Sequence, residues 1–104
     1  MKINVNMKYH QGPVQLVWDK YTYGDRPCLL MVDPVTGEAI CTATVNLPEV
    51  KLAHDEIIIK DWSENEGALQ SLIDAKIVSN PIRQIPTGFV LADVCKLLVE
   101  PDHV

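Results

Sequence analysis

The sequence has no long apolar run. Its longest apolar stretches, such as residues 28–32 and 57–59, have the length of strands, whereas a helix that crosses a bilayer needs about 20 apolar residues. The first residues alternate polar with apolar side chains, so they do not form the apolar segment of a signal peptide. These features predict a cytoplasmic protein.

Paired cysteine motifs are also missing. Cys28, Cys41 and Cys95 lie in apolar segments without CxxC spacing, which predicts reduced and buried thiols. If the strands that carry Cys28 and Cys41 pair as a hairpin, these two thiols come near each other, so a disulfide stays open as an alternative. The spacing of His10, His54 and His103 does not converge on a metal ion.

No motif for nucleophilic catalysis and no phosphate-binding glycine loop is found, because the five glycines stand singly. We therefore expect no catalytic site, no metal and no cofactor, and a protein that is not an enzyme. The one alternative is an acid–base role for Asp61, Glu64 and Glu66. Carboxylates at the start of a helix are more simply explained by the positive end of the helix dipole.

Charge is unevenly distributed along the sequence. The 104 residues carry a net charge of −5 and fit a single domain spanning 1–104. Residues 49–74 hold seven acids and two lysines, which gives −5, while the remainder has seven acids and seven bases. Direct binding to nucleic acid is disfavoured, since that requires clustered positive charge. A protein partner with a basic surface fits better.

Alternating apolar residues predict most of the fold. Residues 2–9 alternate polar and apolar side chains, and residues 14–23 are rich in β-branched and aromatic residues. Residues 28–32 and 39–45 flank a turn with proline and glycine and predict a hairpin. Further strands are predicted at residues 56–61 and 89–98, although the second range also fits a helical period. A short strand is predicted at residues 76–78. The expected class is α+β, with a mostly antiparallel sheet of five or six strands.

One amphipathic helix is expected at about residues 64–75, packed on the sheet. Apolar residues recur at helical spacing after residue 67, and Ser63 and Glu66 have the spacing of a capping box. In that arrangement Trp62 precedes the cap and faces Gly67, which has no side chain to receive it. Trp62 then either packs into the core or stays partly exposed as an interface anchor.

Three segments resemble a known family. They are residues 42–48 (TATVNLP), residues 59–67 (IKDWSENEG), and residues 86–90 (PTGFV) with 94–97 (VCKL). Together they look like a family of short proteins of unknown function that bacterial mobile elements and gut phages encode. The likeness covers roughly residues 13–98 and is most specific at Ser63–Gly67. It implies a setting, that of accessory proteins that bind host or defence machinery such as CRISPR effectors.

The leading hypothesis is a non-enzymatic interaction protein, an inhibitor of a host defence complex, that binds a basic partner surface. The predicted partner-binding residues form an acidic patch around the tryptophan: Asp61, Trp62, Glu64, Asn65 and Glu66. A second hypothesis is a small-molecule-binding domain or minor enzyme, with a pocket between sheet and helix lined by Trp18, Tyr21, Tyr23 and the cysteines. A third is a homodimer that pairs the N-terminal edge strands.

Overall fold

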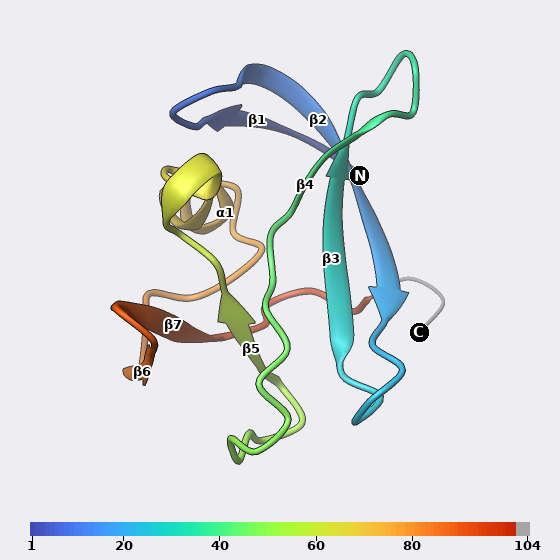
Figure 1. Cartoon of the computed structure of the whole chain (residues 1–104). Coiled ribbons are helices and arrows are strands. Elements are labelled where there is room, and N and C mark those ends of the chain that lie inside the picture. The colour runs from blue at the N-terminus through green and yellow to red at the C-terminus, as the bar shows by residue number, and fades with distance from the viewer. Residues whose placement is uncertain (102–104) are drawn as a thin grey trace.

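The structure is a computed structural model, and it describes residues 1–101. Residues 102–104, including His103, lie outside the described part. Two antiparallel sheets flank one short α-helix (Figure 1). The first sheet has the order β1 (Lys2–Asn6), β2 (Gln11–Lys20), β3 (Pro27–Val32), β4 (Ala39–Thr42), and the second has the order β5 (Glu56–Ile59), β7 (Val90–Lys96), β6 (Arg83–Thr87). The α+β class is confirmed.

The first sheet follows the alternation in the sequence. Ile3 and Val5 are buried in β1, while the polar residues between them are exposed. The β3–β4 hairpin forms as expected, because the Asp33 carboxylate accepts hydrogen bonds from the backbone N–H groups of Val35 and Thr36 in the turn. The predicted strands at the N-terminus and in the hairpin are therefore confirmed.

The prediction of five or six strands in one sheet is wrong in detail. The described residues form seven strands in two sheets, which meet where the chain bends after β4. There Thr44 bridges to Ile59, and the backbone N–H of Lys60 donates to the carbonyl of Ala43 at 2.8 Å. The additional strand is β6, which the sequence did not suggest because Arg83–Thr87 lacks a regular apolar alternation and contains Pro86.

The helix is shorter than expected. Residues Ser63–Asn65 form one 3-10 turn (η1), and the α-helix α1 spans Ala68–Asp74 only. Ser63 does not cap it: its φ is +57°, and its side chain makes no capping bond. The expected capping box is therefore wrong. Gly67, at φ +101°, turns the chain between the two helical segments, so the helix begins at Ala68, where the apolar pattern starts, and not at residue 64 as the capping-box spacing suggests.

Two apolar clusters lie on the two faces of the second sheet. The three consecutive isoleucines of β5 alternate between them, with Ile57 and Ile59 in the larger cluster and Ile58 in the smaller. The larger cluster is enclosed by α1, the first sheet and β5, and α1 lies between the β1–β2 hairpin and the second sheet (Figure 1). The smaller cluster is covered by the segment between β4 and β5.

Residues 89–98 are confirmed as mainly strand, while residues 76–78 contribute a single bridge from Val78 to Leu97.

Candidate partner-binding surface

Asp61 caps the helix. One of its carboxylate oxygens accepts hydrogen bonds from the backbone N–H groups of Gly67 and Leu69, each at 3.0 Å. These N–H groups have no partner inside the helix, so an acceptor placed there stabilises its first turn. Asp61 therefore takes the role that the sequence pattern assigned to Ser63, and the predicted partner-binding carboxylate serves the fold.

Asn65 is buried. Only 1% of its surface is exposed, and its side-chain amide donates to the backbone carbonyl of Thr42 at 2.7 Å. This hydrogen bond joins the 3-10 turn to the end of β4. A buried side chain is out of reach of a partner, so the prediction that Asn65 contacts one is corrected: Asn65 connects two parts of the fold.

Gly67 lies directly against β1. A Cβ atom at this position would stand 2.4 Å from the carbonyl oxygen of Asn6 and 2.9 Å from the Cα of Met7. Close by, the Ser71 hydroxyl accepts from the Asn6 N–H at 3.0 Å and donates to the Gly67 carbonyl at 2.9 Å. The bare face of Gly67 is thus covered by a strand, and the expected contact between Gly67 and Trp62 does not form there.

We call the segment Asp61–Ser71 the junction, because it joins β1, β4, β5 and α1. Its most specific sequence features have structural roles: a capping carboxylate, a buried amide, a glycine against a strand and a serine that bonds to that strand. A short motif with the composition of a binding epitope thus contributes several residues to the fold, while Ser63, Glu64 and Glu66 stay exposed.

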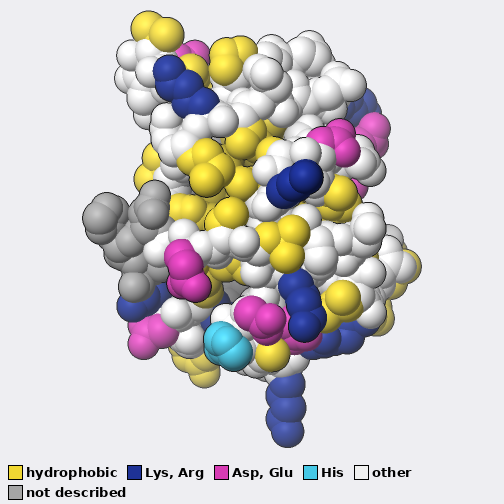
Figure 2. Space-filling view, turned by 180° about the vertical axis from the view of Figure 1, so that it is seen from behind, with side chains coloured by type: hydrophobic (Ala, Val, Ile, Leu, Met, Phe, Trp, Pro, Cys, Tyr) yellow, Lys and Arg dark blue, Asp and Glu magenta, His cyan; other side chains and the backbone are white. Residues whose placement is uncertain are grey.

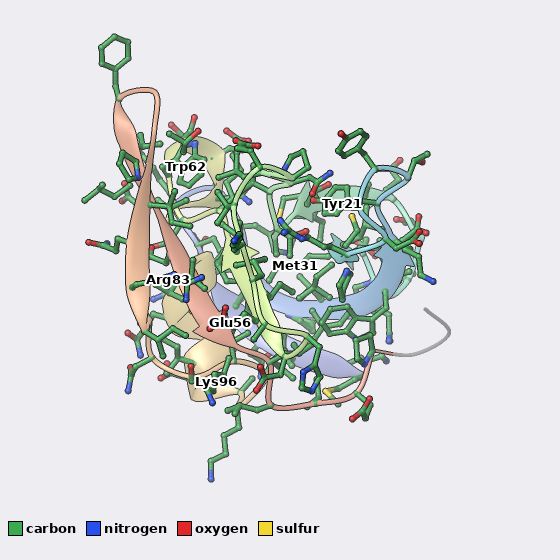
Figure 3. All side chains as sticks on the ribbon, turned by 90° about the horizontal axis from the view of Figure 1, so that it is seen from below. Tyr21, Met31, Glu56, Trp62, Arg83 and Lys96 are labelled. Atoms are coloured by element: carbon green, nitrogen blue, oxygen red, sulfur yellow. The ribbon has the colours of Figure 1, made fainter. Side chains whose placement is uncertain are left out.

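Trp62 is half-buried and points to the other side of the second sheet. It packs against the smaller apolar cluster, whose fully buried members are Ile58, Ala92 and Val94. Figure 3 shows its side chain beside the β6–β7 hairpin. Both expectations for Trp62 are thus met in part: it contributes to a core and keeps some of its surface in contact with solvent.

The acids of residues 49–74 separate into two groups. Asp55 and Glu56 lie at the start of β5, whereas Asp61, Glu64 and Glu66 follow its end, and four residues of strand span roughly 13 Å. Figure 3 shows Glu56 next to Arg83 and apart from Trp62. The fold therefore does not concentrate the negative charge at one end of β5.

Basic residues neutralise part of this charge. Glu56 pairs with Arg83 at 3.1 Å, and Asp55 lies 3.8 Å from Lys96, so two bases from outside the segment offset its acids. On the face seen in Figure 2, acidic and basic side chains are interspersed. The charge counted along the sequence overstates the field of the folded surface.

Glu64 and Glu66 remain as exposed carboxylates of the junction. The Lys60 ammonium lies 2.6 Å from Glu64, and its hydrogen bond lowers the pKa of that carboxyl to about 2. Glu64 is therefore ionised at neutral pH. Together with the exposed part of Trp62, these two acids are what the fold leaves of the predicted acidic patch.

The β6–β7 hairpin carries an apolar surface that the sequence reasoning missed. Thr87 pairs with Val90, so the turn between the strands consists of Gly88, at φ +62°, and Phe89. Phe89 is 108% exposed, more than in an extended chain, and Leu91 is 53% exposed. The signal was present as Thr-Gly-Phe-Val, because a two-residue turn with glycine first exposes its second residue.

Further exposed apolar residues lie on this hairpin and directly before it. Leu91 pairs with Pro86, so the two share a face, and Ile82 immediately precedes β6. Ile82 is 45% exposed. We call these four residues the hairpin surface: Ile82, Pro86, Phe89 and Leu91.

The pocket expected between sheet and helix is not formed by the aromatic residues named for it. Trp18 packs on the larger cluster, and Tyr23 is exposed. Tyr21 lines a cavity of about 10 Å³, which has room for one water molecule, and its hydroxyl lies 2.8 Å from that of Thr44. Burial raises the pKa of Tyr21 to about 12, so it stays protonated at neutral pH.

All three cysteines are free. Cys28 lies opposite Asp19, and Cys41 lies opposite Met31, so the two thiols do not face each other across the hairpin. Burial raises the pKa of Cys95 to about 12, and burial also raises the pKa of Cys41. Because the thiolate is the reactive form, neither of these two residues is a favourable nucleophile. Only Cys95 is fully buried, while the other two are half-buried.

Within residues 1–101, no three His, Cys, Asp or Glu side chains gather closely enough to hold a metal ion. No helix in the same range is long and apolar enough to cross a membrane. Comparison with known proteins adds no relative: no family model, curated protein or solved structure matches this chain.

Proposed function

We propose that this chain is a non-enzymatic interaction protein, an accessory of a phage or mobile element that binds a host protein with a basic surface. An inhibitor of a host defence complex, such as a CRISPR effector, is the form of this function that the family resemblance implies. The observation that carries the proposal is the hairpin surface, where Phe89 and Leu91 stand exposed without contributing to a core.

Exposed apolar side chains of this size support an interface. Large aromatic residues dominate the binding energy of protein interfaces, since they bury much area and lose little side-chain entropy. The half-exposed Trp62 lies beside the same hairpin (Figure 3) and is of the residue type most enriched among binding hot spots. Trp62 packs on the face of the second sheet opposite to that of Leu91 and Pro86, so it flanks the hairpin surface without extending it.

The charge supports a basic partner. A chain of net charge −5 is attracted to a positive surface over several ångströms, and exposed Glu64 and Glu66 add negative charge close to Trp62 in the sequence. Electrostatic attraction of this kind mainly raises the association rate. We therefore assign the carboxylates to steering and the aromatic side chains to affinity.

Charge reversal tests this proposal. The test uses the double variant E64K/E66K and leaves Asp61 intact, because Asp61 caps α1. The control is E38K/E100K, which makes the same change in net charge at two other exposed acids. After capture from a native host lysate and mass spectrometry, the junction variant is expected to recover less of a specific protein than the control does. Equal recovery by both variants would refute the local role of these acids.

Small-molecule binding remains the second candidate. A groove of about 310 Å³ lies between the β2–β3 turn and residues 52–56, with Asp25, Arg26, His54 and Glu56 in its lining. Its volume is at the lower end of the range of ligand sites. A thermal-shift screen against nucleotides and common metabolites tests it, since a ligand that binds only the folded state raises the melting temperature.

A further inference from the structure

We infer that Phe89 is the anchor of the interaction, and that its ring inserts into an apolar pocket of a protein partner whose surrounding surface is basic. This inference rests on the proposed function and specifies how recognition occurs. It starts from one juxtaposition: a fully exposed phenylalanine at the tip of a two-residue turn, on a hairpin with further exposed apolar side chains.

Phe89 takes no part in the packing of the fold. The position follows Gly88 in a turn where small polar residues are common, and Phe89 belongs to neither apolar cluster. Its strands hold it firmly, because β7 is the central strand of its sheet and pairs on both sides. A large ring presented on a fixed support keeps most of its binding energy, since little conformational entropy is lost on binding.

Pro86 argues against recognition by strand addition. Thr87 and Val90 close the two-residue turn as a hydrogen-bonded pair, so alternation along β6 directs the backbone nitrogen of Pro86 toward the free edge. Proline has no N–H, and the free edge of β6 therefore lacks a donor where an added strand needs one. Side chains, and Phe89 above all, are left to make the contact.

The exposed ring of Phe89 and the negative charge of the chain decide between partners. A symmetric contact that brings two hairpin tips together would place one exposed ring against the other, with no pocket for either. Two chains of charge −5 also repel each other, as do this chain and an anionic membrane. A concave apolar pocket receives the exposed ring, and a basic surface around it complements the net charge of the chain, to which the exposed Glu64 and Glu66 contribute.

The experiment begins with photocrosslinking from defined positions. A photoreactive phenylalanine analogue is introduced into the full chain at position 89, at position 64 and, as control, at position 35. Val35 is 91% exposed in the turn between β3 and β4, so it matches Phe89 in setting and in apolar character. A protein crosslinked from position 89 in bacterial host cells is then purified for affinity measurements.

Affinity decides the outcome. Phe89→Ser is expected to weaken binding of the purified partner about 30-fold, as for a hot-spot residue, whereas Val35→Ser changes it less than about twofold. Phe89→Leu is expected to recover part of the loss because it restores apolar volume. Equal affinities for Phe89→Ser and Val35→Ser would overturn the inference.

Other outcomes separate this inference from the proposed function. A partner crosslinked from position 64 but not from position 89 overturns the anchor and leaves the proposed function in place. If neither position crosslinks a protein, both fall. Flotation with vesicles of phosphatidylcholine and phosphatidylglycerol overturns the inference if binding depends on Phe89. Light scattering does the same if the chain self-associates and Phe89→Ser abolishes that association.

Discussion

The junction and the β6–β7 hairpin differ in how far their side chains contribute to the fold. The junction has the composition of a binding epitope, with a tryptophan among acids, yet Asp61, Asn65 and Gly67 are engaged with the helix and the strands. The hairpin has an ordinary sequence, yet Phe89 contacts neither core. Composition alone does not locate a binding surface, because a side chain is free for a partner only when the fold does not use it.

Replacing Gly67 is expected to have the largest effect on stability, and it tests whether the junction supports the fold. Gly67→Ala is expected to destabilise the protein by about 3 kcal/mol or more, because the added Cβ would meet the Asn6 carbonyl at 2.4 Å and φ is +101°. Equilibrium urea unfolding measures the loss. Gly24→Ala is the control, since Gly24 also has positive φ but open space around it, and a loss of about 1 kcal/mol is expected there. Equal losses would show that the close approach to β1 is unimportant.

Replacing Asn65 is expected to have the second-largest effect on the free energy of unfolding. Asn65→Ala removes the hydrogen bond to the Thr42 carbonyl and leaves a cavity, so we expect a loss of about 2 to 3 kcal/mol in the free energy of unfolding. The exposed Asn4 in β1 supplies the control, because Asn4→Ala should change stability by less than about 0.5 kcal/mol. A neutral effect at position 65 would show that the hydrogen bond to Thr42 contributes little to the stability of the fold.

Asp61 is expected to have a moderate effect. Asp61→Ala deprives the N–H groups of Gly67 and Leu69 of their acceptor and should cost about 1 to 2 kcal/mol. Ser63→Ala should cost less than about 0.5 kcal/mol, since Ser63 does not cap the helix. Urea unfolding of the two variants distinguishes the observed cap from the one that the sequence pattern predicts, and the opposite order of losses would favour the capping box.

The ion pair between Lys60 and Glu64 is expected to have the smallest effect on stability. The pKa of Glu64 is about 2, below the ordinary value of 4.5, because Lys60 donates a hydrogen bond to it. The ion pair therefore stabilises the folded state above about pH 4.5, and this contribution is lost as the pH falls toward 2. NMR titration of the Glu64 carboxyl carbon tests the value, and Lys60→Gln should raise the midpoint. A midpoint near 4.5 in the unmodified protein would contradict the pairing.

Much of the fold follows from residue alternation. The buried Ile3 and Val5 and the divided isoleucines of β5 lie where period-two patterns place them. Strand β6 was missed because its residues show no such pattern, and the proline it contains is tolerated only at an edge. Local patterns predict elements well, but the bend at Thr44 that divides the sheet depends on contacts distant in sequence.

The candidate site was harder to predict for the same reason. The sequence has the capping-box spacing at Ser63 and Glu66, but in the structure Asp61 accepts the hydrogen bonds from the first N–H groups of the helix. That Asn65 is buried follows from its contact with Thr42, 23 residues earlier. The exposure of Phe89 is accessible from the sequence, because a glycine followed by one residue between two strands indicates a two-residue turn at Gly88 and Phe89.

The free energy of unfolding of Phe89→Ser tests the central claim most directly. The claim is that the fold depends on the junction and leaves the hairpin tip free. The variant is expected to unfold within about 0.5 kcal/mol of the unmodified protein, because an exposed side chain outside both clusters contributes little to stability. A loss of about 2 kcal/mol or more would mean that Phe89 packs against the protein itself, and the contrast between the two regions would not hold.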